Sequence, residues 1–338
     1  MTVLSWMPAP VGIRGTSYGG VEGDATAWID DFFAKIETLN LIKTSDTGQY
    51  FGTLKNPQYG STAKADLAYR MYRLEDALAT TLPIYIRITI YRYGSPVGAA
   101  NGSFHGCEIA VGMNVNGSGG FIGASQAFNT CLRSTSISTA SHVTPAITVQ
   151  RSYQSYAVAN ADKGAFGLVF NPGQKPIRAG GADSEAVLSD LSFYIERIPN
   201  PDGTPSAEGF TIWARDHLPT WVNDFSTLTN DAKNTQDTNI VQGVTILANG
   251  TKYTTTYGCP VFPQTYIQNE YLVNNFYHSV PEPVRCSGLV AIAPSRVNGG
   301  VQFEAVAYGA LSTNYIALPD TSRLRGSSTP LTLAMLWE

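Results

Sequence analysis

One short segment of the chain alternates strictly between isoleucine and other residues. Isoleucine occupies every even position from Ile84 to Ile90, and the residues between them are tyrosine, arginine or threonine. Successive side chains of a β-strand point to opposite faces, so this pattern predicts a strand with one wholly apolar face. Such a face needs a covering layer, and this need constrains the fold more than any other feature of the chain.

Two segments before this strand have the spacing of amphipathic helices. The first begins after Asp24, a candidate N-cap, and its apolar residues share one side: Trp28, Ile29, Phe32, Phe33, Ile36 and Leu39. The second begins near Thr62 and ends before Pro83, with a narrow seam of Leu67, Met71, Leu74 and Leu78. Both helices are expected to cover the isoleucine face, which predicts an α+β unit over residues 22–95.

The remaining chain, residues 96–338, contains short apolar runs separated by turn-forming dipeptides. Five of these suit the positive φ angles of tight hairpins: Asn101-Gly102, Asn116-Gly117, Asp202-Gly203, Asn249-Gly250 and Asn298-Gly299. Further strands are predicted at residues 107–115, 146–153, 165–170, 186–198, 209–215, 288–293, 313–318 and 331–337.

The predicted fold is mainly β (α+β): a β-sandwich or jelly-roll-like body with two N-terminal amphipathic helices packed on a sheet. The β-rich body of residues 96–338 is either a separate unit or one domain with residues 22–95. Residues 1–21 contain prolines and glycines without periodicity, so we expect an extended N-terminal arm.

Charged residues are few. They make up 14% of the chain, against roughly 25% in an ordinary soluble domain, and the formal net charge is −4. This balance offers no bulk attraction to nucleic-acid phosphates or anionic membranes, so neither is expected as a main partner. The sequence has no apolar run of roughly 18 residues and no basic segment followed by an apolar run at its N-terminus. We therefore expect neither a membrane span nor an ordinary secretion signal.

The four cysteines offer no metal-binding pattern. Cys107, Cys131, Cys259 and Cys286 form no C-x-x-C motif. We expect small buried thiols in a reduced compartment and no zinc site, while their number leaves disulfides open.

Several strings resemble parts of enzymes. Ser61-Thr62-Ala63-Lys64 has the S-x-x-K form of β-lactamases, but no K-T-G motif accompanies it, so a helix cap followed by a solvated lysine is the preferred interpretation. The segment from Gly117 to Gly123 is rich in glycine, yet it fits neither phosphate-binding pattern, and we predict a hairpin.

The histidines and carboxylates of the sequence predict neither a hydrolase site nor a metal centre. The histidines are His105, His142, His217 and His278, and the neighbouring pair Asp216-His217 is explained by a turn. A carboxylate pair for glycoside hydrolysis has no fixed spacing in sequence, which leaves Glu185, Asp190 and Glu196 as candidates. We therefore predict that the chain has no catalytic, cofactor-binding or metal-binding residue and that it is not an enzyme.

Two stretches resemble virion structural proteins of tailed bacteriophages. They run from Met7 to Gly15 and from Tyr315-Ile316-Ala317-Leu318-Pro319-Asp320 through Trp337. The resemblance is to neck, tail, baseplate or capsid-associated proteins. It implies assembly by protein contacts, without a cofactor, in a virion made in the host cytoplasm.

The sequence thus predicts a non-enzymatic structural subunit of a phage virion. Its partners would be copies of itself and other virion proteins, contacted through the arm, the C-terminal strand and long polar loops at residues 97–103, 114–120, 171–184, 199–208 and 223–239. The alternative is a carbohydrate- or receptor-binding module of a tail or fibre, with a cell-surface glycan as ligand. A polysaccharide hydrolase is the third hypothesis.

Overall fold

The chain is mainly β. The computed structural model describes residues 2–5, 26, 29–55, 64–93, 104–129, 132–133, 155–170, 187–188, 191–200, 202–216, 240–255, 265–266, 288–292, 302–307, 312–317 and 332–337. Every strand pairing within these residues is antiparallel. None of the helical residues described forms a segment long and apolar enough to cross a bilayer.

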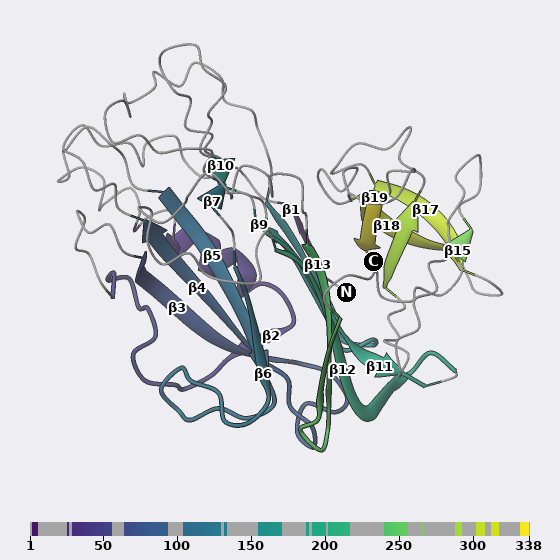
Figure 1. Cartoon of the computed structure of the whole chain (residues 1–338), viewed down its shortest axis with the longest axis horizontal. Coiled ribbons are helices and arrows are strands. Elements are labelled where there is room, and N and C mark those ends of the chain that lie inside the picture. Colours follow the sequence, from purple (N-terminus) through teal and green to yellow (C-terminus); the bar gives the residue numbers. More distant parts are fainter. Residues whose placement is uncertain are drawn as a thin grey trace, which may run out of the picture.

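Three larger sheets contain most of the strands (Figure 1). The β2–β6 sheet runs in chain order through β2 (Leu41–Lys43), β3 (Lys64–Leu74), β4 (Tyr85–Tyr93), β5 (Phe104–Gly112) and β6 (Ser125–Asn129). The seven-stranded sheet has the order β1 (Thr2–Ser5), β8 (Tyr156–Asn160), β9 (Ala165–Phe170), β11 (Leu191–Pro199), β12 (Pro205–Asp216), β13 (Ile240–Leu247) and β14 (Lys252–Thr255).

The third sheet has the order β15 (Thr265–Tyr266), β17 (Gln302–Ala307), β18 (Ser312–Ala317), β19 (Thr332–Leu336) and β16 (Leu289–Ile292). A short pair, β7 (Leu132–Arg133) with β10 (Val187–Leu188), stands apart from these three. The three larger sheets lie in succession, with the seven-stranded sheet in the middle (Figure 1).

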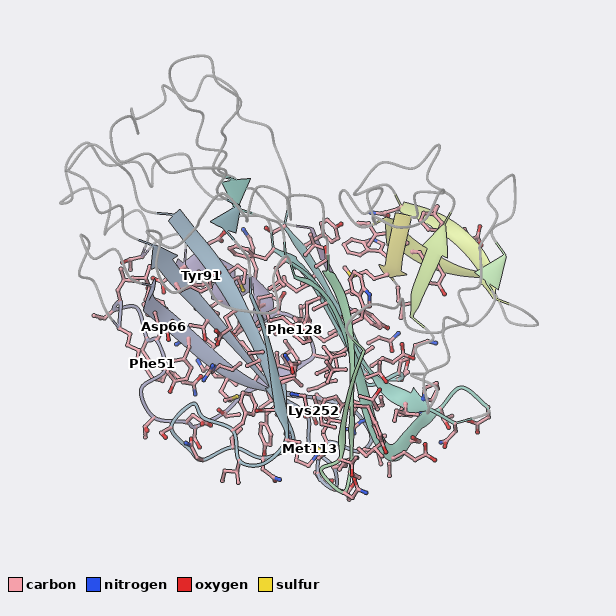
Figure 2. All side chains as sticks on the ribbon, viewed as in Figure 1. Phe51, Asp66, Tyr91, Met113, Phe128 and Lys252 are labelled. Atoms are coloured by element: carbon pink, nitrogen blue, oxygen red, sulfur yellow. The ribbon has the colours of Figure 1, made fainter. Side chains whose placement is uncertain are left out.

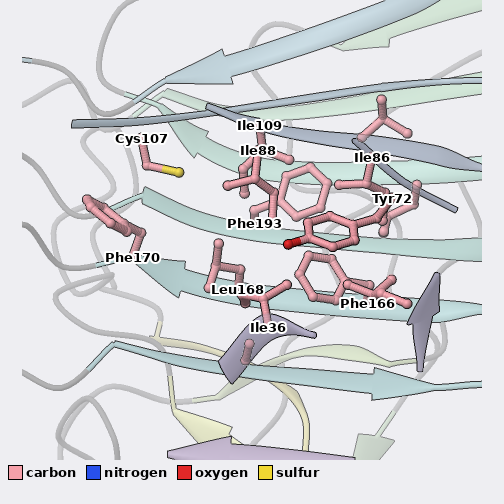
Figure 3. Close-up of a cluster of buried hydrophobic side chains, with 14 of the residues drawn as sticks. Ile36, Tyr72, Ile86, Ile88, Cys107, Ile109, Phe166, Leu168, Phe170 and Phe193 are labelled. Atoms are coloured by element: carbon pink, nitrogen blue, oxygen red, sulfur yellow. The ribbon is translucent and has the colours of Figure 1, made fainter. Parts of the chain in front are cut away.

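The alternating isoleucine strand is confirmed as β4. Ile84, Ile86, Ile88 and Ile90 are all fully buried and belong to one core cluster. The residues that cover them come largely from the seven-stranded sheet, including Phe166, Leu168, Phe193 and Ile195. Figure 3 shows the side chains of these two sheets gathered in one core. The layer required by the isoleucine face is therefore mostly another sheet.

Of the first predicted helix, Thr26 and residues 29–36 are described as helical, and the helix ends at Ile36. Its described apolar residues are buried, Trp28 lies outside the described residues, and two phenylalanines contact different parts of the fold. The Phe32 ring lies 5.8 Å from that of Phe170 in β9, and the Phe33 ring lies 6.1 Å from that of Tyr50. The helix thus contacts both the seven-stranded sheet and the β2–β3 connection, and its buried side chains belong to the shared core.

The second predicted helix is wrong, because residues 64–74 form strand β3. β3 lies between β2 and β4, so its backbone groups are bonded on both sides. Ala68, Tyr72 and Leu74 point into the core as alternate residues, and an irregularity between Asp66 and Ala68 shifts the register there. The helical spacing of the leucines was coincidental, since pairing with two neighbouring strands outweighs a weak local preference.

Strands β8, β9 and nearly all of β11 in the seven-stranded sheet are buried on both faces. Every residue of β8 and β9 is buried. Ala157 and Ala159 face the core shared with the β2–β6 sheet, whereas Tyr156 and Val158 belong to a second cluster on the opposite face. The third sheet contributes Ile316, Met335, Leu336 and Trp337 to that second cluster. The predicted C-terminal strand at residues 331–337 is therefore confirmed as β19, packed on the chain's own body.

The turn dipeptides are confirmed where the structure describes them. Asn249-Gly250 joins β13 to β14, and Asp202-Gly203 lies between β11 and β12; both glycines have a φ of 84°. Asn101-Gly102, Asn298-Gly299 and the strand predicted at 146–153 lie outside the described residues. Of the predicted arm, the structure describes only residues 2–5, which pair with β8 as β1.

Candidate functional site

Most residues considered from the sequence for chemistry lie outside the described part of the chain. These are Ser61, Cys131, His142, Glu185, Asp190, His217, Cys259, His278 and Cys286. Among the others, Lys64 begins strand β3, so the expected helix cap with a lysine in its first turn is wrong. His105 lies in β5, Asp216 ends β12, and Cys107 is a buried thiol in the core. No group of three His, Cys, Asp or Glu residues that could hold a metal ion occurs among the described residues.

The glycine-rich segment forms a hairpin, as predicted. A bridge pairs Val115 with Phe121, and Gly117, Gly119 and Gly123 all have positive φ. The N–H groups of Ser118 and Gly120 both donate to Asn116 Oδ1 at 2.9 Å, and the Gly119 N–H donates to Asp46 Oδ2 at 2.9 Å. A phosphate-binding loop offers such N–H groups to its ligand, whereas here they are bound within the protein.

This hairpin is attached to the outer face of the β2–β6 sheet by the Arg87 cluster, which we define as Asp46, Tyr69, Arg87, Glu108 and Gly119. Arg87 Nη1 donates to the Gly119 carbonyl at 2.8 Å, and Nη2 donates to Glu108 Oε1 at 2.7 Å. A Cβ on Gly119 would lie 2.6 Å from the Tyr69 ring, so only glycine fits this position. Burial, with help from the Asp46 charge, raises the pKa of Tyr69, and Arg87 opposes the rise.

A second group of polar residues joins the helix to strand β3. The guanidinium of Arg70 lies 5.3 Å from the Phe33 and Tyr50 ring centroids and 5.0 Å from that of Phe51. Its Nε donates to Glu37 Oε1 at 3.3 Å. Arginine favours such sites because its planar cation stacks on aromatic faces. Arg70 therefore ties the end of the helix to β3.

A buried ion pair connects the two sheets that share the core. Arg197 in β11 donates from Nε to Asp76 Oδ2 at 2.7 Å and from Nη2 to Asp76 Oδ1 at 3.0 Å. Both side chains have no exposed surface. Asp76 lies in the connection between β3 and β4, and Arg197 Nη2 also donates to the Leu82 carbonyl there at 2.7 Å. This bidentate ion pair fixes the β3–β4 connection against the seven-stranded sheet.

Glu196, the candidate for glycoside hydrolysis that the structure describes, is 1% exposed on the opposite face of β11. Its Oε2 accepts bonds from the Tyr194 hydroxyl at 3.0 Å and from the Gly288 N–H at 2.8 Å. Gly288 immediately precedes β16 of the third sheet. The carboxylate therefore helps hold the third sheet against the seven-stranded sheet.

In each of these clusters a carboxylate binds an arginine or a backbone N–H from another element. These ion pairs and hydrogen bonds therefore serve the structure: they fix loops and sheets of the chain to one another at defined points. The sequence alone does not identify Arg70, Asp76, Arg87 or Arg197 as members of such contacts. The available indication is the pair Glu196-Arg197 within a mostly apolar segment, because charges in such a strand need buried partners.

Comparisons with protein families, with curated proteins and with solved structures found no match to this chain.

Proposed function

We propose that the protein is a non-enzymatic structural subunit of a phage virion, with a β-sandwich or jelly-roll-like body, that assembles with copies of itself and other virion proteins. The observation that carries this proposal is the arrangement of the seven-stranded sheet. Each of its inner strands is hydrogen-bonded to a neighbour on both sides, so among the described residues the places left for further strand pairing in this sheet are its edges, β1 and β14. Open antiparallel edges are sites at which protein chains add strands to one another.

The composition of the surface supports the same proposal. Few charges are present to repel a second copy, since only 14% of residues are charged. Three large apolar side chains are exposed among the described residues: Ile42, Phe51 and Ile122. All three belong to the β2–β6 sheet or its connections, where contact with another protein would bury them.

Two measurements test the proposal. Mass spectrometry of purified particles should find the chain as a stoichiometric component. Size-exclusion chromatography with light scattering should show an oligomer, or a complex formed with other proteins of the same particle. A monomer that is absent from particles and binds none of their proteins would contradict the proposal.

The alternative, a carbohydrate- or receptor-binding module, is favoured by one observation. Phe51 (Figure 2) is 67% exposed. Lys43 Nζ lies 5.7 Å from its ring centroid, which gives a surface aromatic beside a hydrogen-bond donor. Glycan-array binding that is lost in Phe51→Ala and kept in Ile122→Ala would favour this function over the structural one.

A further inference from the structure

We infer that β1 is an exchangeable strand: in the assembled state, residues Thr2–Ser5 of one copy pair with β8 of a neighbouring copy in the register that they use within one chain. The inference rests on the proposed function and names the partner, a second copy of this chain, and the segment that makes the contact.

The first observation is that β1 pairs with one strand only. Its register with β8 matches Thr2 with Ala159, Val3 with Val158, Leu4 with Ala157 and Ser5 with Tyr156. β8 is bonded to β9 on its other side. Removing β1 would therefore leave the rest of the sheet intact and expose one edge of β8.

The second observation is the length of chain beside β1. Twenty residues, 6–25, separate it from Thr26, the next described residue. At roughly 3.3–3.6 Å per residue, such a segment can span about 70 Å when extended. A sheet of seven strands, with strands about 4.8 Å apart, is roughly 30 Å wide. The connection is therefore long enough for β1 to reach the same edge on an adjacent copy.

The third observation is that this edge carries no charge. Neither Thr2–Ser5 nor Tyr156–Asn160 contains a charged residue, and the first charged residue of the chain is Arg14. Natural sheets guard their edges with lysine or proline, and the opposite edge here has Lys252 in β14. The uncharged edge at β8 has no such guard and accepts β1 from either chain equally well.

Concentration then decides which chain supplies the strand. Exchange keeps the same backbone pairing, so the two forms differ mainly in how the segment is brought to the edge. A segment tethered by a short connection to its own pairing partner has an effective concentration on the order of 1 mM. Pairing within one chain should dominate in dilute solution, and pairing between chains should dominate where copies are crowded, as in a particle.

Cysteine cross-linking tests the inference. Antiparallel partners have Cα atoms about 4.5–5.5 Å apart, which suits a disulfide. The double variant Val3→Cys/Val158→Cys should link within a monomer at micromolar concentration. A mixture of the two single variants should give a linked dimer that increases about tenfold or more as the protein approaches about 1 mM. Mass spectrometry of the joined peptides would identify the cysteines involved.

Ala159→Cys is the matched control for Val158→Cys. Ala159 and Val158 are neighbours whose side chains lie on opposite faces of the sheet. Mixed with Val3→Cys, the control should give no linked dimer. The inference is overturned if the Val158→Cys mixture gives no more dimer than this control at any concentration, or if the double variant gives no link at all.

Light scattering on the same samples separates this inference from the proposed function. Oligomers without a link between chains would refute exchange of β1 and leave the role as a subunit standing. Monomers at every concentration, alone and with other virion proteins, would refute both.

Discussion

Replacing Asp76 by alanine should destabilise the fold strongly. The variant would leave the Arg197 guanidinium in the core, with the Leu82 carbonyl as its remaining acceptor at 2.7 Å. Removing one partner of a buried ion pair typically costs about 3–5 kcal/mol, because the other charge stays desolvated. The variant also loses the bond from the Leu78 N–H to Asp76 Oδ1, worth about 0.5–1.5 kcal/mol. We therefore expect a loss of about 4–6 kcal/mol in the free energy of unfolding.

Equilibrium unfolding in denaturant measures this loss, and two further variants show its origin. Asp76→Asn keeps an oxygen that can accept from Leu78, so its difference from Asp76→Ala separates the turn bond from the charge. In Asp76→Ala combined with Arg197→Met neither of the two positions carries a charge, and an apolar replacement of a buried pair is often nearly neutral. The double variant should therefore be several kcal/mol more stable than Asp76→Ala alone.

The matched control is Glu75→Ala. Glu75 pairs with Arg73 at 3.1 Å, but the two side chains are 46% and 30% exposed, so its loss should cost about 0–1 kcal/mol. The reasoning is refuted if Asp76→Ala costs no more than this control, or if adding Arg197→Met gives no recovery.

Three other substitutions or conditions test particular contacts. Ile86→Asp should prevent folding, because it places an unpaired carboxylate at a fully buried position; soluble protein that melts cooperatively would show that the face is misassigned. Gly119→Ala should lower the melting temperature more than Gly117→Ala, since both have positive φ but only the first places a Cβ 2.6 Å from the Tyr69 ring; equal shifts would contradict this packing. The free energy of unfolding should fall as pH rises above about 10, because burial raises the pKa of Tyr69 and Tyr72 and the folded chain then binds more protons than the unfolded one. Tyr72→Phe should make this decrease with pH less steep. An unchanged slope would argue against the burial of the Tyr72 hydroxyl.

A strand can be predicted from the sequence when only one of its faces lies in the apolar core, because its apolar residues then alternate with other residues. β4 has one face in the core, so its isoleucines alternate and the sequence alone identifies it. β3 has Ala68 and Tyr72 on the core face but Met71 fully buried on the other, so its apolar residues do not alternate. The resulting spacing fits a helix as well as a strand. Only the neighbouring strands decide between them.

The polar clusters could not be predicted because their members are distant in sequence. Arg197 and Asp76 are 121 residues apart, and Asp46 and Gly119 are 73 residues apart. No spacing rule joins such positions, since the fold alone brings them together. The glycine-rich hairpin was predictable in shape from its turn residues, whereas the carboxylate that binds the Gly119 N–H was not.

The position of the charges links the fold to the proposed assembly. Arg87 fixes a hairpin to the β2–β6 sheet, Arg197 joins that sheet to the seven-stranded sheet, and Glu196 joins the seven-stranded sheet to the third. A chain with only 14% charged residues thus uses several of them at the contacts between its layers. Contacts of this kind need defined geometry, so they add fixed points of alignment to the close-packed apolar core. A subunit that repeats in a particle needs such alignment, because small rotations between its layers would add up over many copies.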